Sequence, residues 1–253
     1  MLLKNILARL AVAAACLSVF VAAWYGVIGL LDLQPFILPT PRDVAIAIGQ
    51  QYPMLASNMA ITLKTGLLGI VISTALAFLT AAVFSSNKGL AQVFMPYLIA
   101  MKNTPIVAIA PIVMLFLGRG VMTGIAVVTI VSFLPMMVNC LQGFQAVGSR
   151  HLELLHMYAA RPAQVFWKVR FPFAVQYVFA GLRTAVPAAV LGALLAEWLT
   201  GAKGIGSFIL EASAMRDLEI LWGAIIVCMG TSMAIFWLTV LAERFYERRH
   251  PSR

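Results

Sequence analysis

The sequence predicts an all-α protein that crosses a lipid bilayer six times, and three observations support this fold class. Of its 253 residues, 62% are hydrophobic and only 11% are charged, whereas a soluble domain carries about a quarter charged residues. Several apolar stretches are long enough to cross a hydrocarbon layer of about 30 Å. Basic residues gather at alternate ends of these stretches, as is typical of cytoplasmic flanks.

The six predicted spans form one transmembrane domain over residues 1–253. They cover residues of about 5–31, 60–84, 91–117, 121–144, 174–199 and 218–242. An even number of spans and the basic flanks together predict that both termini lie in the cytoplasm, an N-in/C-in topology. The first apolar run continues to about Leu31, which is too long for a cleaved signal peptide, so we interpret it as a retained span.

Two of the spans have unusual compositions: the third contains several prolines, and the fifth contains small residues at helical spacing. The third span contains Pro96, Pro105 and Pro111, which predict a kinked or partly unwound backbone that other parts of the protein shield or that lines a cavity. Small residues at helical spacing in the fifth span allow close approach of another helix, either in a second copy or within one subunit. They are Gly181, Ala185, Ala188, Ala189, Gly192 and Ala193.

The segment 145–173, between the fourth and fifth spans, is too polar to enter lipid and is predicted to be cytoplasmic. Its first half alternates apolar and charged residues around Glu153, which suits a short amphipathic helix. A turn is expected at Arg161, with Pro162 at the first position of a second helix. That helix is expected to stop before Pro172.

This segment resembles the EAA loop of the permease subunits of ATP-binding-cassette (ABC) importers. In that loop, Glu-Ala-Ala, three residues and Gly are followed, after nine more residues, by Ile-x-Leu-Pro. Here Glu153 and Pro172 match at the same spacing, and Ala159 stands at the glycine position. A left-handed conformation would cost alanine about 1–2 kcal/mol, so a turn shifted to Arg161 and Pro162 is the alternative.

Further stretches are similar to the nitrate, sulfonate and taurine branch of these permeases. They are ILPTPRDV, TLKTGLLGIVIS, MKNTPIVAIAPIVMLFLG, FAGLRTAV and AEWLTGAKGIGSFI. The resemblance implies a multi-pass protein of the bacterial inner membrane that works with a dimer of ATPase subunits, a substrate-binding protein and a second permease copy, expected to be identical. It implies that Glu153, Ala159, Arg161, Pro162 and Pro172 form the element that couples to the ATPase.

Ionisable groups inside spans are costly and indicate a protein interior or a cavity. Lys102, Asn103 and Thr104, just before Pro105, and Arg183 in the fifth span are therefore candidates for the translocation path. Either cation would suit an anionic cargo such as a sulfonate, or would pair with a carbonyl or an acid. Glu197 is expected to close an external gate, to pair with Lys203 or to lie in the headgroup layer.

The sequence argues against several other functions. It contains no GxxxxGK[ST] motif, so ATP and Mg²⁺ are expected on a partner ATPase, and no cofactor or nucleic acid is expected on this chain. The spans contain no constellation of catalytic residues, and the spacing of His151 and His156 does not suit a metal site. An ion-gradient-driven secondary transporter is the alternative, although such proteins often carry acids at mid-span. A pyrimidine-like cofactor precursor is the alternative cargo.

Overall fold

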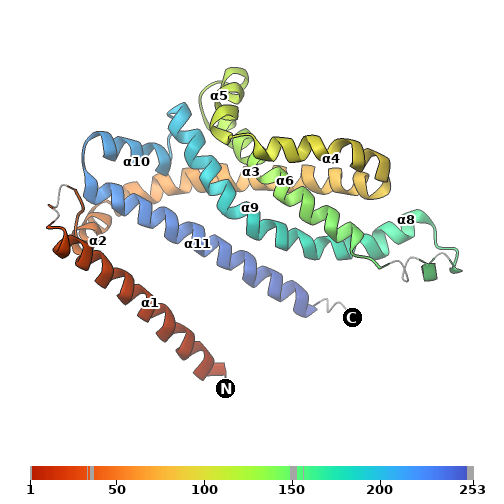
Figure 1. Cartoon of the computed structure of the whole chain (residues 1–253), viewed down its shortest axis with the longest axis horizontal. Helices are drawn as coiled ribbons and strands as arrows, with labels where there is room; N and C mark the ends of the chain where they lie inside the picture. The colour runs from red at the N-terminus through yellow and green to blue at the C-terminus, as the bar shows by residue number, and fades with distance from the viewer. Residues whose placement is uncertain (1, 33, 35–36, 149–152, 156, 250–253) are drawn as a thin grey trace. The chain divides into compact units, whose positions relative to one another are not determined.

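The structure, a computed structural model, describes residues 2–32, 34, 37–148, 153–155 and 157–249. Within these ranges the regular structure is entirely helical (Figure 1). The principal helices are α1 (Leu2–Leu30), α2 (Pro41–Gln50), α3 (Tyr52–Ser86), α4 (Lys88–Asn103), α5 (Ile106–Leu117), α6 (Val121–Gln145), α8 (Pro162–Val165), α9 (Phe171–Thr200), α10 (Ile205–Ala214) and α11 (Leu218–Arg249), with a π-helical segment, Phe166–Arg170, before α9. The predicted all-α class is confirmed.

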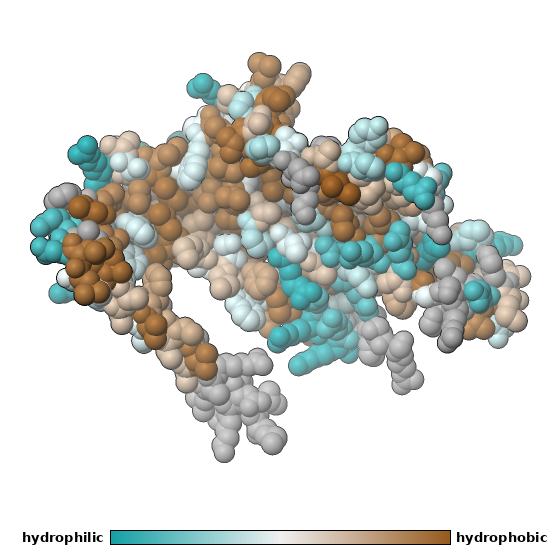
Figure 2. Space-filling model, viewed as in Figure 1, coloured by the Kyte–Doolittle hydropathy of each residue, from teal (hydrophilic) through white to brown (hydrophobic). Residues whose placement is uncertain are grey.

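Four helical stretches in the described part of the chain are long and apolar enough to cross a membrane: Tyr52–Ser86, Val121–Gln145, Pro162–Thr200 and Leu218–Arg249. Shorter apolar helices include Ser18–Leu30 and Ile106–Leu117. Hydrophobic residues cover much of the visible surface (Figure 2), as expected of helices that face lipid. The exact count of six spans and the N-in/C-in orientation stay predictions.

The chain divides into two compact units, Met1–Ala56 with Phe208–Val227, and Ser57–Ser207 with Cys228–Arg253. In the first unit, the indole N–H of Trp24 donates to the backbone oxygen of Pro39 at 3.1 Å. Thr40 then caps α2, because its hydroxyl oxygen accepts from the Asp43 N–H, and Pro41 occupies the first turn. A short helix, α2, therefore follows α1 in this unit.

The core of the second unit is the packing of α6 against α9, which lie side by side (Figure 1). Glycines permit this close approach: a Cβ at Gly143 would lie 2.8 Å from Cα of Ala174, and one at Gly181 would lie 2.9 Å from Sδ of Met136. Gly181 of the fifth span therefore contributes to packing within the subunit. The small residues of this span that are buried in α9 are Gly181, Ala185, Ala189, Gly192 and Ala193.

The third predicted span is broken, as its prolines predict. Helix α4 ends at Asn103 and α5 begins at Ile106, with Thr104 and Pro105 between them. Pro105 has an extended conformation, with φ −58° and ψ 124°. The missing N–H of proline and its clash with the preceding turn explain why the helix stops here.

The expected end of the helix before Pro172 is wrong. The chain is helical from Pro162 to Thr200, and Pro172 lies in the first turn of α9. The π-helical segment before it is the physical reason, because there the Phe171 N–H donates to the oxygen of Phe166, five residues back. This wider turn relieves the clash that proline causes in a regular α-helix.

Candidate functional site

The turn predicted to couple to an ATPase is built around Ala159. Ala159 has φ +52°, in the left-handed region, and the N–H of Ala160 donates to the oxygen of Leu155 at 3.0 Å. This is the long hydrogen bond of a Schellman motif, which usually has glycine at the left-handed position. The turn is therefore not shifted to Arg161 and Pro162. Ala159 takes the left-handed conformation expected at the glycine position of the EAA loop.

A second helix, α8, begins at Pro162, three residues after Ala159. Arg161 is its N-cap, with extended backbone angles, and Pro162 takes the first helical position, as predicted. The side-chain oxygen of Gln164 accepts a hydrogen bond from the N–H of Arg161 at 2.9 Å. The left-handed residue and this cap, close together in sequence, give the segment a defined reversal.

Large apolar side chains and charged side chains are both exposed on this reversal. Met157 and Tyr158 each have 83% of their surface exposed, and Leu154 has 53%. Glu153 and Arg161 are exposed beside them. We call Leu154, Met157 and Tyr158 the apolar knob. His151 and His156 lie outside the described residues.

A cavity of about 450 Å³ lies beside the break between α4 and α5. Its walls come from α4, α5, α6 and α9, and they are apolar apart from backbone groups and the Thr104 hydroxyl, which donates to the oxygen of Ala100. Thr104 is thus the predicted path residue that the structure places at a cavity. Lys102 and Asn103 end α4, and their side chains lie outside the described part of the structure.

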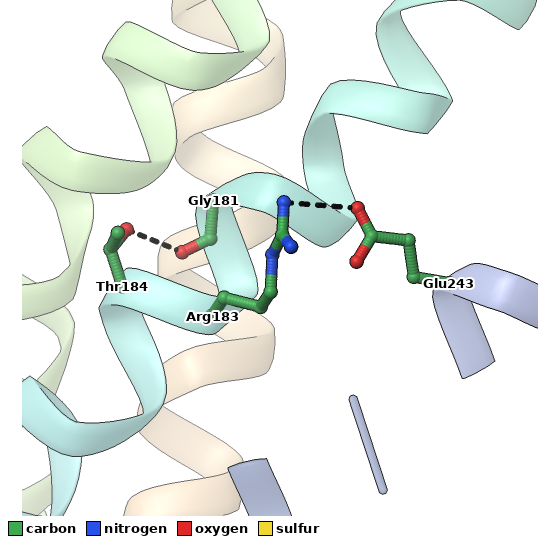
Figure 3. Close-up of polar contacts among 4 residues, drawn as sticks. All are labelled: Gly181, Arg183, Thr184 and Glu243. Atoms are coloured by element: carbon green, nitrogen blue, oxygen red, sulfur yellow. Dashed lines mark hydrogen bonds and ion pairs between the residues drawn. The ribbon is translucent and has the colours of Figure 1, made fainter. Parts of the chain in front are cut away.

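Arg183 does not line this cavity. Its guanidinium, on α9, pairs with the carboxylate of Glu243, on α11, at 3.2 Å (Figure 3). The rings of Phe179 and Tyr246 pack 5.4 Å apart between the same two helices. Of the two roles that the sequence left open, pairing with an acid is the one observed. Glu243 was missed because it lies in the charged C-terminal stretch.

Glu197 is buried, with only 4% of its surface exposed. One carboxyl oxygen accepts from the Thr62 hydroxyl at 2.7 Å, and the other accepts from the Gly206 N–H at 2.7 Å. The Thr62 hydroxyl oxygen also accepts from the N–H of Ile205 at 2.9 Å. Glu197 is thus held by neighbouring groups of the protein, and among the described residues it has no ion pair with Lys203.

This network holds the end of α9 against the segment that follows it. A Cβ on Gly204 would overlap the carboxyl group of Glu197, and one on Gly206 would lie 2.8 Å from Oε2. The indole N–H of Trp198 donates to the oxygen of Gly206 at 2.8 Å. The spacing of glycines in GAKGIG after an acid was the signal in the sequence, but nothing in it pointed to Thr62.

Several long apolar helices and a broken apolar stretch are the features of a polytopic membrane protein. Residues 69–249 match the family of inner membrane components of binding-protein-dependent transport systems, and the chain belongs to this family. It is an integral component of the inner membrane, a transport subunit and not itself an enzyme. Membership implies a separate binding protein as a partner.

Among curated relatives, the formylaminopyrimidine transport permease of Halalkalibacterium halodurans is 30% identical over 176 residues, covering 69% of this chain and 70% of the relative. The riboflavin permease of Chloroflexus aurantiacus is 26% identical, covering 92% and 87%. The taurine permease of Escherichia coli K12 is 24% identical, covering 92% and 86%. The branch recognised in the sequence is confirmed.

The fold has a counterpart among solved structures. An amino acid ABC transporter crystallised with histidines aligns with a TM-score of 0.63 at 17% identity, covering 81% of this chain and 97% of that chain. This likeness concerns the arrangement of helices alone.

Proposed function

We propose that this chain is the translocation subunit of an ABC importer, that two copies pair in the membrane, and that each docks on an ATPase subunit through the segment 149–172. A binding protein delivers a small solute to the outer face. ATP and Mg²⁺ bind to the ATPase, whose closure and reopening move the docked segments and through them the spans.

The observation that carries this proposal is the exposed apolar knob on a structured turn. Large apolar side chains that are exposed outside a span indicate a protein partner. Glu153 and Arg161 flank the knob and supply charges that select a complementary surface. The left-handed turn at Ala159 and the cap at Arg161 connect the knob to a continuous helix that runs from Pro162 to Thr200. A displacement of the knob by a docked ATPase is therefore transmitted along this helix to α9.

The contacts of Arg170 support the proposed topology. Its Nη1 donates to the backbone oxygen of Ser85, near the C-terminal end of α3, at 3.4 Å. The α3–α4 connection and the segment after α6 therefore lie on the same side of the second unit. The sequence assigns both to the cytoplasm, as the N-in/C-in topology requires.

For the cargo, we propose an uncharged heteroaromatic solute of the pyrimidine class, with a sulfonate such as taurine, or nitrate, as the second candidate. None of the described residues that line the cavity at the α4–α5 break is charged, and Arg183 is already paired with Glu243. An apolar site with few polar groups suits a flat, neutral ligand. The relatives named for formylaminopyrimidine and riboflavin are consistent with this cargo.

Co-purification tests the coupling role. The tagged chain is co-expressed with its chromosomal neighbours, and the ATPase that copurifies is quantified for wild type, Tyr158→Asp and Arg161→Glu. We expect both variants to release the ATPase, whereas Arg42→Glu, a matched charge reversal at an exposed position of α2, retains it. If no ATPase binds the wild-type chain, the ion-gradient transporter becomes the better interpretation.

Uptake into proteoliposomes tests the cargo. The assembled complex is given radiolabelled formylaminopyrimidine or taurine, with ATP inside the vesicles and its binding protein outside. ATP-dependent uptake of the pyrimidine but not of taurine supports the proposed cargo. Uptake of taurine but not of the pyrimidine supports the sulfonate. Thr104→Val, which removes the hydroxyl at the cavity, is expected to change the transport rate of the true cargo without releasing the ATPase.

A further inference from the structure

A second, more polar cavity lies at the ends of the helices, away from the break between α4 and α5. It has a volume of about 510 Å³ and lies between the α3–α4 connection, the end of α6 and the π-helical segment. Its polar walls are formed by Ser85, Gln92, Gln145 and Arg170, and it shares no lining residue with the first cavity. A cavity of this size accommodates a small ligand.

The hydrogen-bonding capacity of Arg170 is largely unused. A guanidinium is always charged and carries several N–H donors. The Nη1 of Arg170 makes a long hydrogen bond of 3.4 Å to a backbone oxygen, and its buried Nε has no partner in the part of the chain that the structure describes. Among the described residues, no carboxylate lies within 4.0 Å of this guanidinium. A partly buried charge without a counter-charge is unfavourable.

We propose that this cavity binds a phosphate-type oxyanion, with the Arg170 guanidinium supplying the charge and the side-chain amides of Gln92 and Gln145 supplying donors at the rim. Gln92 and Gln145 are both exposed, and none of the described lining residues is acidic. The planar guanidinium fork matches the geometry of an oxyanion. The bound group supplies the counter-charge that Arg170 lacks.

The oxyanion has two sources at this place in the fold. The cavity opens at the ends of helices that are long enough to span a bilayer, where both phospholipid headgroups and soluble phosphate are available. Arg170 also belongs to the helical stretch that continues from the turn at Ala159. An anion bound here therefore ties that turn to the α3–α4 connection.

Binding to the full-length chain in nanodiscs tests the proposal in two arms. In the first, discs of phosphatidylcholine are titrated with inorganic phosphate by calorimetry. In the second, discs contain increasing phosphatidylglycerol, and native mass spectrometry counts the retained anionic lipid. We expect wild type to bind in at least one arm and Arg170→Gln to weaken that binding about ten-fold or more. Binding in the first arm identifies soluble phosphate, and in the second a lipid headgroup.

The control is Lys168→Gln, which removes the same charge from an exposed position of the same segment that does not line the cavity. It should change binding by less than about two-fold, since exposed charges contribute little. Gln145→Glu keeps Arg170 and places a negative charge at the rim of the cavity, so it should also weaken anion binding. This variant tests the proposal if Arg170→Gln does not fold. Absence of binding by wild type, equal binding by both Arg170→Gln and wild type, or an equal loss in Lys168→Gln would overturn the proposal.

Discussion

Replacing Gly204 by alanine should break the buried network at the end of α9. The added Cβ would overlap the carboxyl group of Glu197, which would have to move. The Gly206 N–H then loses its partner, which costs about 1–3 kcal/mol for a buried donor, and forcing an extra methyl into packed surroundings costs about 1–3 kcal/mol more. The Thr62 hydroxyl can donate instead to the backbone oxygen of Asn58, 3.3 Å away, so the loss of its bond to Glu197 adds no further cost in free energy. We expect a loss of about 3 kcal/mol.

Thermal unfolding of the purified protein measures this loss. A change of about 3 kcal/mol corresponds to a fall in Tm of about 6–12 °C for a chain of this size. Gly49→Ala is the matched control, because a Cβ there meets nothing within 4 Å. In a Glu197→Ala background the overlap is gone, so Gly204→Ala should then cost much less than it does alone. An unchanged Tm for Gly204→Ala, or strictly additive losses in the double variant, would refute the reasoning.

Three further substitutions test other parts of the structure. Ala159→Gly should stabilise the left-handed turn by about 1 kcal/mol, seen as slower hydrogen exchange at the Ala160 N–H; faster exchange would contradict the turn. Arg183→Glu should lower the unfolding free energy by about 1–3 kcal/mol. Adding Glu243→Arg should restore most of that stability, as measured by the Tm of the double variant. No recovery would mean that the ion pair is not formed. Gly143→Ala should lower the Tm by an amount equivalent to about 1–3 kcal/mol, because its Cβ would lie 2.8 Å from a backbone atom of α9; a higher Tm would show that α6 and α9 pack differently.

The turn at Ala159 has some features that the sequence predicted and others that it did not. The spacing from Glu153 to Pro172 located the turn, and Arg161 and Pro162 begin the second helix as predicted. The rule that a helix ends before proline failed at Pro172, because it assumes regular α-helical hydrogen bonds. The π-helical segment before Pro172 changes those bonds. The local sequence FWKVR does not predict a π-helix.

The sequence by itself determined that the protein lies in a membrane, which stretches are apolar enough to cross it, and that the third span is interrupted. These properties depend on hydropathy and on proline, which act locally along the chain. Only the tertiary structure decided the partners of the ionisable side chains. Glu197 bonds to a threonine 135 positions away, and Arg183 pairs with a glutamate on another helix. A carboxylate in an apolar stretch must find polar partners, but a one-dimensional pattern does not contain the distances that select them.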